Sequence, residues 1–331
     1  MKNNKAKAIA DGAICSALSA LFMVIYIYVS PLAFLMLLIS GVPMAYLGIK
    51  YGLRICIPGM FISIFALFIL TGDIISALLV GVLNLLPGIV IGRAISKKVN
   101  FSITVLSGAL AVFIGFMIQL VLLNANGGGE GIKNLIDGSI ENAGKIAEPM
   151  LSGLIKQNPE QAMTIQNVWN EALKQIREGI FTYLPSFVIG ASAVVGYLVY
   201  MTYVFVLSRV KKMRLPYLPF KWIRANRTTC NLLVIIYIIT MFSKDTSVWV
   251  LALKNMVTLI NAYLAVCGLA LLDFKLGQKI RSGYARFGIY LAVFFVGYMF
   301  MGLIYQILSL VGFIDSMMDL RRMHKAGDGR G

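Results

Sequence analysis

The first apolar run of the chain opens with the residues Lys5–Ala20, KAKAIADGAICSALSA. Five alanines recur in this stretch at steps of four, three, four and three, which places them on one face of an α-helix. They are Ala6, Ala10, Ala13, Ala17 and Ala20. The other faces carry larger apolar side chains that suit lipid tails, such as Ile14, Leu18 and Phe22. Because small residues let two helix backbones approach closely, the pattern predicts a membrane helix that packs against another helix.

Two kinds of partner are open for this alanine face. Small-residue faces are common inside membrane bundles, which favours another span of the same chain. Small residues in strict register at five positions of the first helix favour a separate protein instead. Both interpretations remain open at the level of the sequence.

The composition assigns the chain to the membrane proteins. Of its 331 residues, 59% are hydrophobic and 13% are charged, and the mean hydropathy is +0.83. A water-soluble domain cannot cover that much apolar surface. We therefore expect an all-α, polytopic transmembrane helical bundle of about eight or nine spans.

The charged residues indicate how the chain is oriented. Lys and Arg outnumber Asp and Glu by 30 to 14, a net charge of +16, and the positive residues lie between the apolar runs. This is the pattern that the positive-inside rule predicts, and it gives no reason to expect a nucleic-acid partner. We expect a multi-pass protein of the bacterial cell membrane with its N-terminus in the cytoplasm.

The apolar runs divide the chain into three regions. Residues 1–208 are expected to form a six-span domain that includes a polar outer loop at 124–179. Residues 209–229 form a basic cytoplasmic loop, and residues 230–331 form a C-terminal membrane subdomain with a basic tail. Apolar residues return at helical spacing in the outer loop, which predicts amphipathic helices over the bundle or on the membrane surface. Pro43 lies inside the second span and should kink or split it.

Polar residues inside membrane spans are costly and usually functional. The fourth span carries Asp73 at its outer mouth and Asn84 further in, and a later span carries Lys254, Thr258 and Asn261 on one face. At 1.5 Å per residue, Lys254 lies about 10 Å below the outer end of its helix. We expect the five residues to line an outward-facing ligand pocket in which Lys254 meets an anionic group. In the alternative, Lys254 snorkels to the surface and the amides pair with backbone carbonyls.

Catalytic and metal-binding motifs are absent from the sequence. It has no nucleotide-binding loop, no HExxH and no Ser/His/Asp arrangement, and its single histidine, His324, lies in the polar tail. We therefore expect no enzyme activity, no cofactor and no metal site. Asp315 and Asp319 are expected to pair with Arg322 and a helix end rather than to hold a cation.

Four short stretches resemble the YybS-like family of uncharacterised bacterial membrane proteins. They are Pro43-Met44 with Lys50-Tyr51-Gly52, Leu86-Pro87-Gly88 with Gly92, Leu218-Pro219-Phe220-Lys221-Trp222, and Gly312-x-x-Asp315-x-x-x-Asp319-x-Arg321. In its N-terminal half, this family is similar to the S components of energy-coupling-factor transporters. Those are six-helix membrane proteins whose first helix docks on a transmembrane coupling subunit through an Ala-x-x-x-Ala motif, which Ala6–Ala10 and Ala13–Ala17 match. The long outer loop and the C-terminal membrane extension depart from an ordinary S component.

Two functions from different classes follow. The resemblance implies a solute-binding subunit that takes a small molecule from outside and depends on a transmembrane coupling subunit and ATPases for transport. The alternative is a membrane protein that transports nothing and has an interaction or regulatory role.

Overall fold

The computed structural model describes residues 2–210, 213, 215, 217–243, 247–280, 282, 285, 286, 288, 289 and 301–321. Loop positions Lys211, Lys212 and Arg214 and the basic tail after Arg321 lie outside the described residues. The long helices are α1 (Lys2–Tyr28), α4 (Leu53–Thr71), α5 (Ile74–Ser96), α6 (Phe101–Asn126), α7 (Gly131–Gln157), α8 (Ala162–Val210) and α10 (Val248–Lys279). The shorter ones are α2 (Ala33–Ile39), α3 (Val42–Lys50), α9 (Arg227–Phe242) and α12 (Met301–Met318), with 3-10 turns at Ser30–Leu32, Pro159–Gln161 and Phe220–Trp222.

The predicted all-α membrane bundle is confirmed. Seven helical segments of the described chain are long and apolar enough to cross a membrane: Lys5–Tyr28, Ser30–Lys50, Leu53–Thr71, Ile74–Ser96, Phe101–Asn126, Pro159–Val210 and Val248–Lys279. Two shorter apolar helices are Arg227–Phe242 and Leu303–Met318. Throughout the described residues the regular structure is helical, without a strand.

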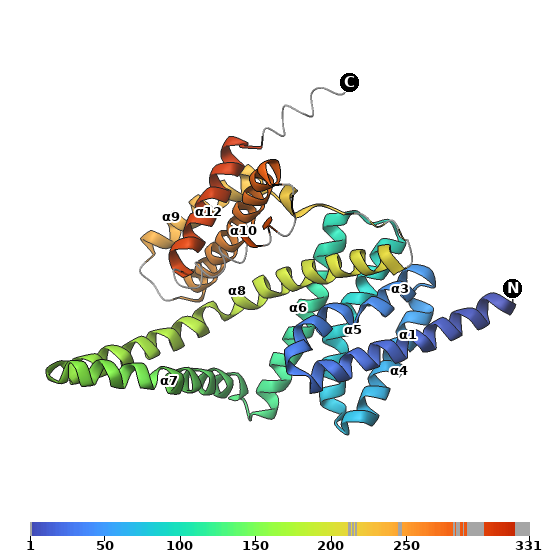
Figure 1. The fold of residues 1–331 in the computed structure, drawn as a ribbon, viewed down its shortest axis with the longest axis horizontal. Coiled ribbons are helices and arrows are strands. Elements are labelled where there is room, and N and C mark those ends of the chain that lie inside the picture. The colour runs from blue at the N-terminus through green and yellow to red at the C-terminus, as the bar shows by residue number, and fades with distance from the viewer. Residues whose placement is uncertain are drawn as a thin grey trace. The chain divides into compact units, whose positions relative to one another are not determined.

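The chain forms two compact units. The first consists of Met1–Leu184 with Ala191–Tyr217, and the second consists of Pro185–Gly190 with Leu218–Gly331. Figure 1 shows the succession of helices along the chain.

Close backbone contact between α3 and α5 organises the first unit. A Cβ atom on Gly92 would lie 2.5 Å from the Ala45 carbonyl oxygen, and one on Gly48 would lie 3.2 Å from the Cα atom of Gly92. Gly88 and Gly92 form a Gly-x-x-x-Gly step on α5, which permits this approach because neither residue has a side chain in the way. Larger apolar side chains fill the space beside the crossing.

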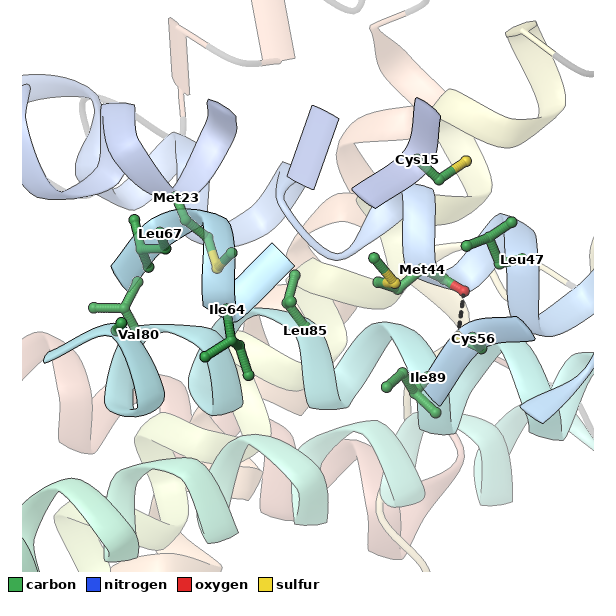
Figure 2. Packing of buried hydrophobic residues seen from close by; sticks show 11 residues of the cluster. Cys15, Met23, Met44, Leu47, Cys56, Ile64, Leu67, Val80, Leu85 and Ile89 are labelled. Carbon is green, nitrogen blue, oxygen red and sulfur yellow. Dashed lines mark hydrogen bonds between the residues drawn. The ribbon is translucent and has the colours of Figure 1, made fainter. Parts of the chain in front are cut away.

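These side chains form a core between α1, α3, α4 and α5 (Figure 2). Met23 of α1, Met44 of α3 and Leu67 of α4 are fully buried in it. The Cys56 thiol also lies there and donates a hydrogen bond to the Met44 carbonyl oxygen at 3.2 Å, joining α4 to α3. The core holds together the helices that carry Ser19 and Asn84, two of the polar residues described below.

A small-residue crossing also organises the second unit. A Cβ atom on Gly312 of α12 would lie 2.9 Å from the Gly268 nitrogen of α10. Beyond the crossing, Asp315 forms a fully buried ion pair with Arg321 at 3.0 Å, and Asp319 pairs with Arg224 at 2.6 Å. The two aspartates are therefore ion-paired as expected, but with Arg321 and Arg224 instead of Arg322, which lies outside the described residues.

The polar outer loop is largely helical. It contains α7 and the first part of α8, as the apolar spacing predicts. The sixth span does not begin as a separate helix near residue 180, because α8 continues through Gly179 and Pro185 as one helix of 49 residues. One element therefore belongs both to the outer loop and to a candidate span.

Candidate functional site

The second candidate span is interrupted at Ser40 and Gly41, between the end of α2 at Ile39 and the start of α3 at Val42. Pro43 lies in the first turn of α3. Proline has no backbone N–H, so the Ile39 carbonyl loses the donor that a continuous helix would supply. The prediction that Pro43 splits the span is confirmed.

Three buried polar side chains converge on this interruption. Ser19 of α1 donates from its hydroxyl to the Ser40 carbonyl oxygen at 3.0 Å, and the Ser40 hydroxyl donates to Asn84 Oδ1 at 2.7 Å. Asn84 Nδ2 in turn donates to the Val80 carbonyl oxygen at 2.9 Å within α5. Ser19 and Ser40 are 0% exposed and Asn84 is 1% exposed, so the hydrogen bonds offset a desolvation cost that buried polar groups otherwise carry.

Tyr203 of α8 brings a fourth polar group to the same place. Its side chain is 0% exposed, and a Cβ atom on Gly41 would lie 3.0 Å from Tyr203 Cζ and 2.7 Å from the Asn84 carbonyl oxygen. Among the described residues, the Tyr203 hydroxyl has no hydrogen-bond partner. We call Ser19, Ser40, Asn84 and Tyr203 the interruption cluster. Its members are uncharged, and the Tyr203 hydroxyl can donate to a bound polar molecule. The Ser19 and Ser40 hydroxyls already donate within the cluster, so they can only accept from such a molecule.

Asn84 is a predicted ligand-binding residue, and that role stays a prediction. The sequence does not single out Tyr203, Ser19 or Ser40 as its neighbours. Ser19 lies in the quoted first stretch, beside the alanines, so the pattern drew attention to its helix but not to its role. Tyr203 is one of 15 tyrosines and follows Asn84 by more than a hundred residues. No local pattern links the two positions.

Asp73 lies apart from Asn84 and caps the start of α5. Its side chain accepts a hydrogen bond from the Ile75 N–H at 2.9 Å and another from the Ser76 hydroxyl. The bond from Ser76 and then that from Ile75 hold the pKa of Asp73 below its ordinary value. Eleven residues of helix, about 16 Å, separate Asp73 from Asn84, so the two do not meet. The predicted role of Asp73 in ligand binding stays a prediction.

The three residues predicted in a later span all belong to the second unit. Thr258 donates to the Lys254 carbonyl oxygen at 3.0 Å, and Asn261 Oδ1 accepts from Ser309 of α12 at 3.2 Å. The Lys254 side chain is half-buried, and its amine has no hydrogen bond or ion pair with the described residues. Their role in ligand binding stays a prediction.

The alanine face of α1 is not the face that packs on α4. Ala6, Ala10, Ala13 and Ala17 are exposed, and Ala20 is buried. The packed face is adjacent and runs through Gly12, Ser16 and Ser19, all of which are buried.

Hydrogen bonds hold this adjacent face against α4. The Ser16 hydroxyl lies 2.8 Å from the Gly12 carbonyl oxygen of its own helix and 3.0 Å from the Gly59 carbonyl oxygen of α4. Ser63 of α4 donates to the Ser16 carbonyl oxygen at 3.0 Å. Near the start of α1, Asp11 accepts from Lys50 at 2.7 Å and from Tyr51 at 2.6 Å, which ties α1 to the end of α3. Four of the five alanines thus remain available to another molecule.

Comparison with known proteins gives the family but no relative of known function. A family model described as "Predicted membrane protein (DUF2232)" matches residues 17–316. The chain belongs to this family. No curated protein and no solved structure matches the chain. The DUF2232 match takes in the whole interruption cluster and also Lys254, Thr258 and Asn261. It begins after Ala13, so only Ala17 and Ala20 of the alanine face fall within it.

Proposed function

We propose that this DUF2232 protein is a solute-binding subunit of the bacterial cytoplasmic membrane that takes up a small polar molecule at the interruption cluster. The observation that carries the proposal is the fully buried Tyr203 hydroxyl, which has no partner among the described residues and lies beside an interrupted span. Leaving a buried hydroxyl unpaired costs about 1–3 kcal/mol. A solute that accepts a hydrogen bond there recovers that cost.

The position of the cluster supports the same proposal. Membrane transporters commonly bind their substrates where a spanning helix is discontinuous, because backbone and side-chain polar groups are then available at membrane depth. Ser40 and Gly41 form such a discontinuity, and Ser19 and Asn84 reach it from two other helices. The cluster contains no formal charge, which suits a hydroxyl, amide or other uncharged polar group of the solute.

In this proposal, transport depends on partner proteins. The sequence contains no nucleotide-binding motif, so we assign energy supply to ATPases acting through a transmembrane coupling subunit. The exposed alanines at positions 6, 10, 13 and 17 offer a docking face, and the resemblance to S components supports the same use of this helix. The N-terminus would then be cytoplasmic, and the protein would have no enzyme activity of its own.

A second function, that of a membrane protein that binds partners without transporting a solute, is favoured by the same exposed alanine face. Both functions include docking of partner proteins. They differ in the interruption cluster, which in the second function binds no solute and only stabilises the fold.

Native mass spectrometry of the gently solubilised protein tests both functions, because it reports bound small molecules and partner subunits together. We expect the wild-type protein to carry a small polar molecule and to be recovered with ATPase subunits. Partner subunits without any small molecule would favour the second function. Recovery of neither would contradict both.

A pair of tyrosine variants locates the solute. Tyr203→Phe removes the unpaired hydroxyl and should lose the bound molecule. Tyr200→Phe is the matched control, because Tyr200 lies on the same helix, is also 0% exposed and packs edge-on against Phe101 with ring centres 5.3 Å apart. Equal retention in both variants would place the solute outside the interruption cluster.

A further inference from the structure

A groove in the first unit runs between α1, the returning span made of α2 and α3, and the end of α8. Its volume is about 360 Å³, and all of its lining residues belong to the first unit. Asp11, Ile14, Leu18 and Phe22 line it from α1, together with side chains within residues 39–46 and 206–210. We call this hollow the α1 groove.

The α1 groove uses a third face of α1. At 3.6 residues per turn, the groove residues lie about a third of a turn from the alanine face and about as far from the face packed on α4. Ile14 is 60% exposed and Leu18 is 41% exposed, whereas Cys15, Val42 and Leu207 are buried. The groove therefore has a packed floor and is open on its outer side.

Two contacts show that α1 and the returning span run antiparallel. The Ser19 hydroxyl donates to the Ser40 carbonyl oxygen, as described above. Earlier on α1 and later on the returning span, Asp11 pairs with Lys50 at 2.7 Å. The N-terminal end of α1 and the C-terminal end of α3 therefore lie at the same level of the bundle.

The charges of the chain place this level at a membrane surface. Each of the spans that form the groove has an uncharged stretch, and these are residues 12–28, 33–49 and 180–208. A charged residue directly adjoins each stretch, and these are Asp11, Lys50 and Arg209. Because charged side chains within hydrocarbon are costly, these residues mark where the apolar layer ends.

The length of the α1 groove matches one leaflet of a bilayer. From Asp11 to Phe22 it follows α1 for eleven residues, about 16 Å at 1.5 Å per residue. The hydrocarbon core of a bilayer is about 30 Å thick, so one leaflet contributes about half of that. The apolar part of the groove thus begins at the membrane surface and reaches towards the bilayer centre.

The surface end of the groove presents a carboxylate and an ammonium side by side. Lys50 and Tyr51 donate to Asp11 Oδ2 at 2.7 and 2.6 Å, and the Tyr46 hydroxyl lies 3.5 Å from the same oxygen. Asp11 Oδ1 accepts no hydrogen bond from the described residues, so it is available to a further donor. The Lys50 ammonium lies over the rings of Tyr46 and Tyr51, 5.2 and 4.8 Å from their centres. The Lys50 side chain is 36% exposed, so a ligand can reach it.

We infer that the α1 groove holds phosphatidylethanolamine, with an acyl chain along Ile14, Leu18 and Phe22 and the headgroup at Asp11 and Lys50. The primary ammonium of this headgroup donates to Asp11 Oδ1, and its phosphate accepts from Lys50, so both hydrogen bonds are charge-assisted. Phosphatidylglycerol has no cation for Asp11, and the choline of phosphatidylcholine has no N–H to donate. The paired charges of the protein therefore select the lipid that carries the complementary pair.

The inference is tested by photocrosslinking in the full-length protein. The probe is phosphatidylethanolamine with a photoreactive diazirine in one acyl chain, added to vesicles of phosphatidylcholine that contain the reconstituted protein. Peptide mass spectrometry maps the crosslinked residues. Unlabelled phosphatidylethanolamine and phosphatidylglycerol are then compared as competitors at equal amounts.

We expect crosslinks to be several-fold more frequent in residues 14–22 and 206–210 than at lipid-exposed positions outside the groove, such as Phe61 of α4 and Leu106 of α6. Phosphatidylethanolamine should compete several-fold better than phosphatidylglycerol. An even spread of crosslinks over all exposed apolar residues would mean general lipid contact only and would overturn the inference. Absence of crosslinks from the groove, as when a second copy or a partner covers it, would overturn it too, and so would equal competition by the two lipids.

A charge variant tests the headgroup contact. Asp11→Asn should abolish the preference for phosphatidylethanolamine over phosphatidylglycerol. It should still fold, because the ion pair with Lys50 is partly exposed and asparagine keeps an acceptor for Tyr51. Asp137→Asn is the matched control, since it removes the acid of another partly exposed ion pair, with Arg177 in the outer loop. Full preference in Asp11→Asn would contradict the assigned headgroup.

A volume variant tests the acyl-chain contact independently of charge. Leu18→Trp narrows the groove from an exposed position and should lower crosslinking within it several-fold. Leu106→Trp makes the same change on α6, where the leucine is 68% exposed and does not line the groove, and should leave crosslinking unchanged. Equal crosslinking in the two variants would mean that no acyl chain occupies the α1 groove.

Discussion

Leucine at Ala13 and Ala17 tests which face of α1 meets another protein. Both alanines are exposed, so two larger side chains should find room beside the bundle and suit lipid or detergent. The matched control places leucine on the adjacent packed face, at Ser16 and Ser19, which are 1% and 0% exposed. The two double variants add similar apolar volume to one helix within the same two turns.

The two double variants should lose different amounts of stability, because positions 16 and 19 are packed against neighbouring residues and positions 13 and 17 are exposed. A Cβ atom on Gly59 would already lie 3.1 Å from Ser16 Oγ, so leucine at position 16 must push α1 away from α4. Overpacking of this kind costs about 1–3 kcal/mol. Each lost serine hydrogen bond adds about 0.5–1.5 kcal/mol. The control should therefore lose several kcal/mol of stability, whereas the alanine-face variant should stay within about 0.5 kcal/mol of wild type.

Thermal unfolding in detergent can be followed with a thiol-reactive dye, because all four cysteines are buried thiols and none forms a disulfide with the described residues. Partner recovery is measured on the same preparations. The alanine-face variant should melt like wild type but lose its partners, and the packed-face variant should melt early. An alanine-face variant that melts early while recovering every wild-type partner would refute the assignment of this face to docking.

Three further predictions follow from single contacts. Asp315→Leu should lower the free energy of unfolding by about 3–5 kcal/mol, because it leaves the fully buried Arg321 charge uncompensated. The double variant Asp315→Leu with Arg321→Leu should recover part of that stability in thermal unfolding. The pKa of Asp73 is lowered in the folded protein, so its capping interaction stabilises the fold above the ordinary carboxyl pKa of 3.8 and is lost as the pH falls below that value. In unfolding scans at decreasing pH, the wild-type protein should therefore lose more stability than Asp73→Asn, whose side chain can cap the helix but does not titrate. Lys254→Met should abolish retention of an anionic ligand in native mass spectra at unchanged expression if the predicted pocket exists, and unchanged retention would assign this lysine to snorkelling.

Several features of the fold could be predicted from local sequence. Long apolar runs can be stable only as membrane helices, because a helix satisfies its own backbone groups in lipid. The interruption near Pro43 could also be predicted from the sequence, since proline has no N–H and therefore removes a hydrogen bond from the turn directly before it. The helical outer loop followed from the spacing of its apolar residues. Its continuation into α8 did not, because neither Gly179 nor Pro185 ends that helix in its tertiary setting.

The candidate site depended far more on tertiary structure. Asn84 was singled out because an amide inside an apolar span is costly wherever its partners lie. Tyr203 joins it only because α8 packs where Gly41 leaves room for the ring, a relation between residues far apart in the chain. Asp73, equally polar in sequence, proved to cap a helix through Ile75 and Ser76.

The alanines of α1 show the division between the two sources of information most clearly. Their spacing alone established that they share one face, because the helical repeat is a local property of the backbone. Which face the bundle covers depends on the helices that surround α1. The adjacent face of Gly12, Ser16 and Ser19 packs on α4, where the Ser16 hydroxyl donates to the Gly59 carbonyl oxygen, a bond that alanine cannot make. The sequence by itself determined the membrane class, the split of the second span at Pro43 and the alanine face. It did not determine where the sixth span begins, because α8 continues through Gly179 and Pro185 as one helix. The tertiary structure decided that Ala6, Ala10, Ala13 and Ala17 stay uncovered, because burial is a property of the assembled helices and not of any one of them.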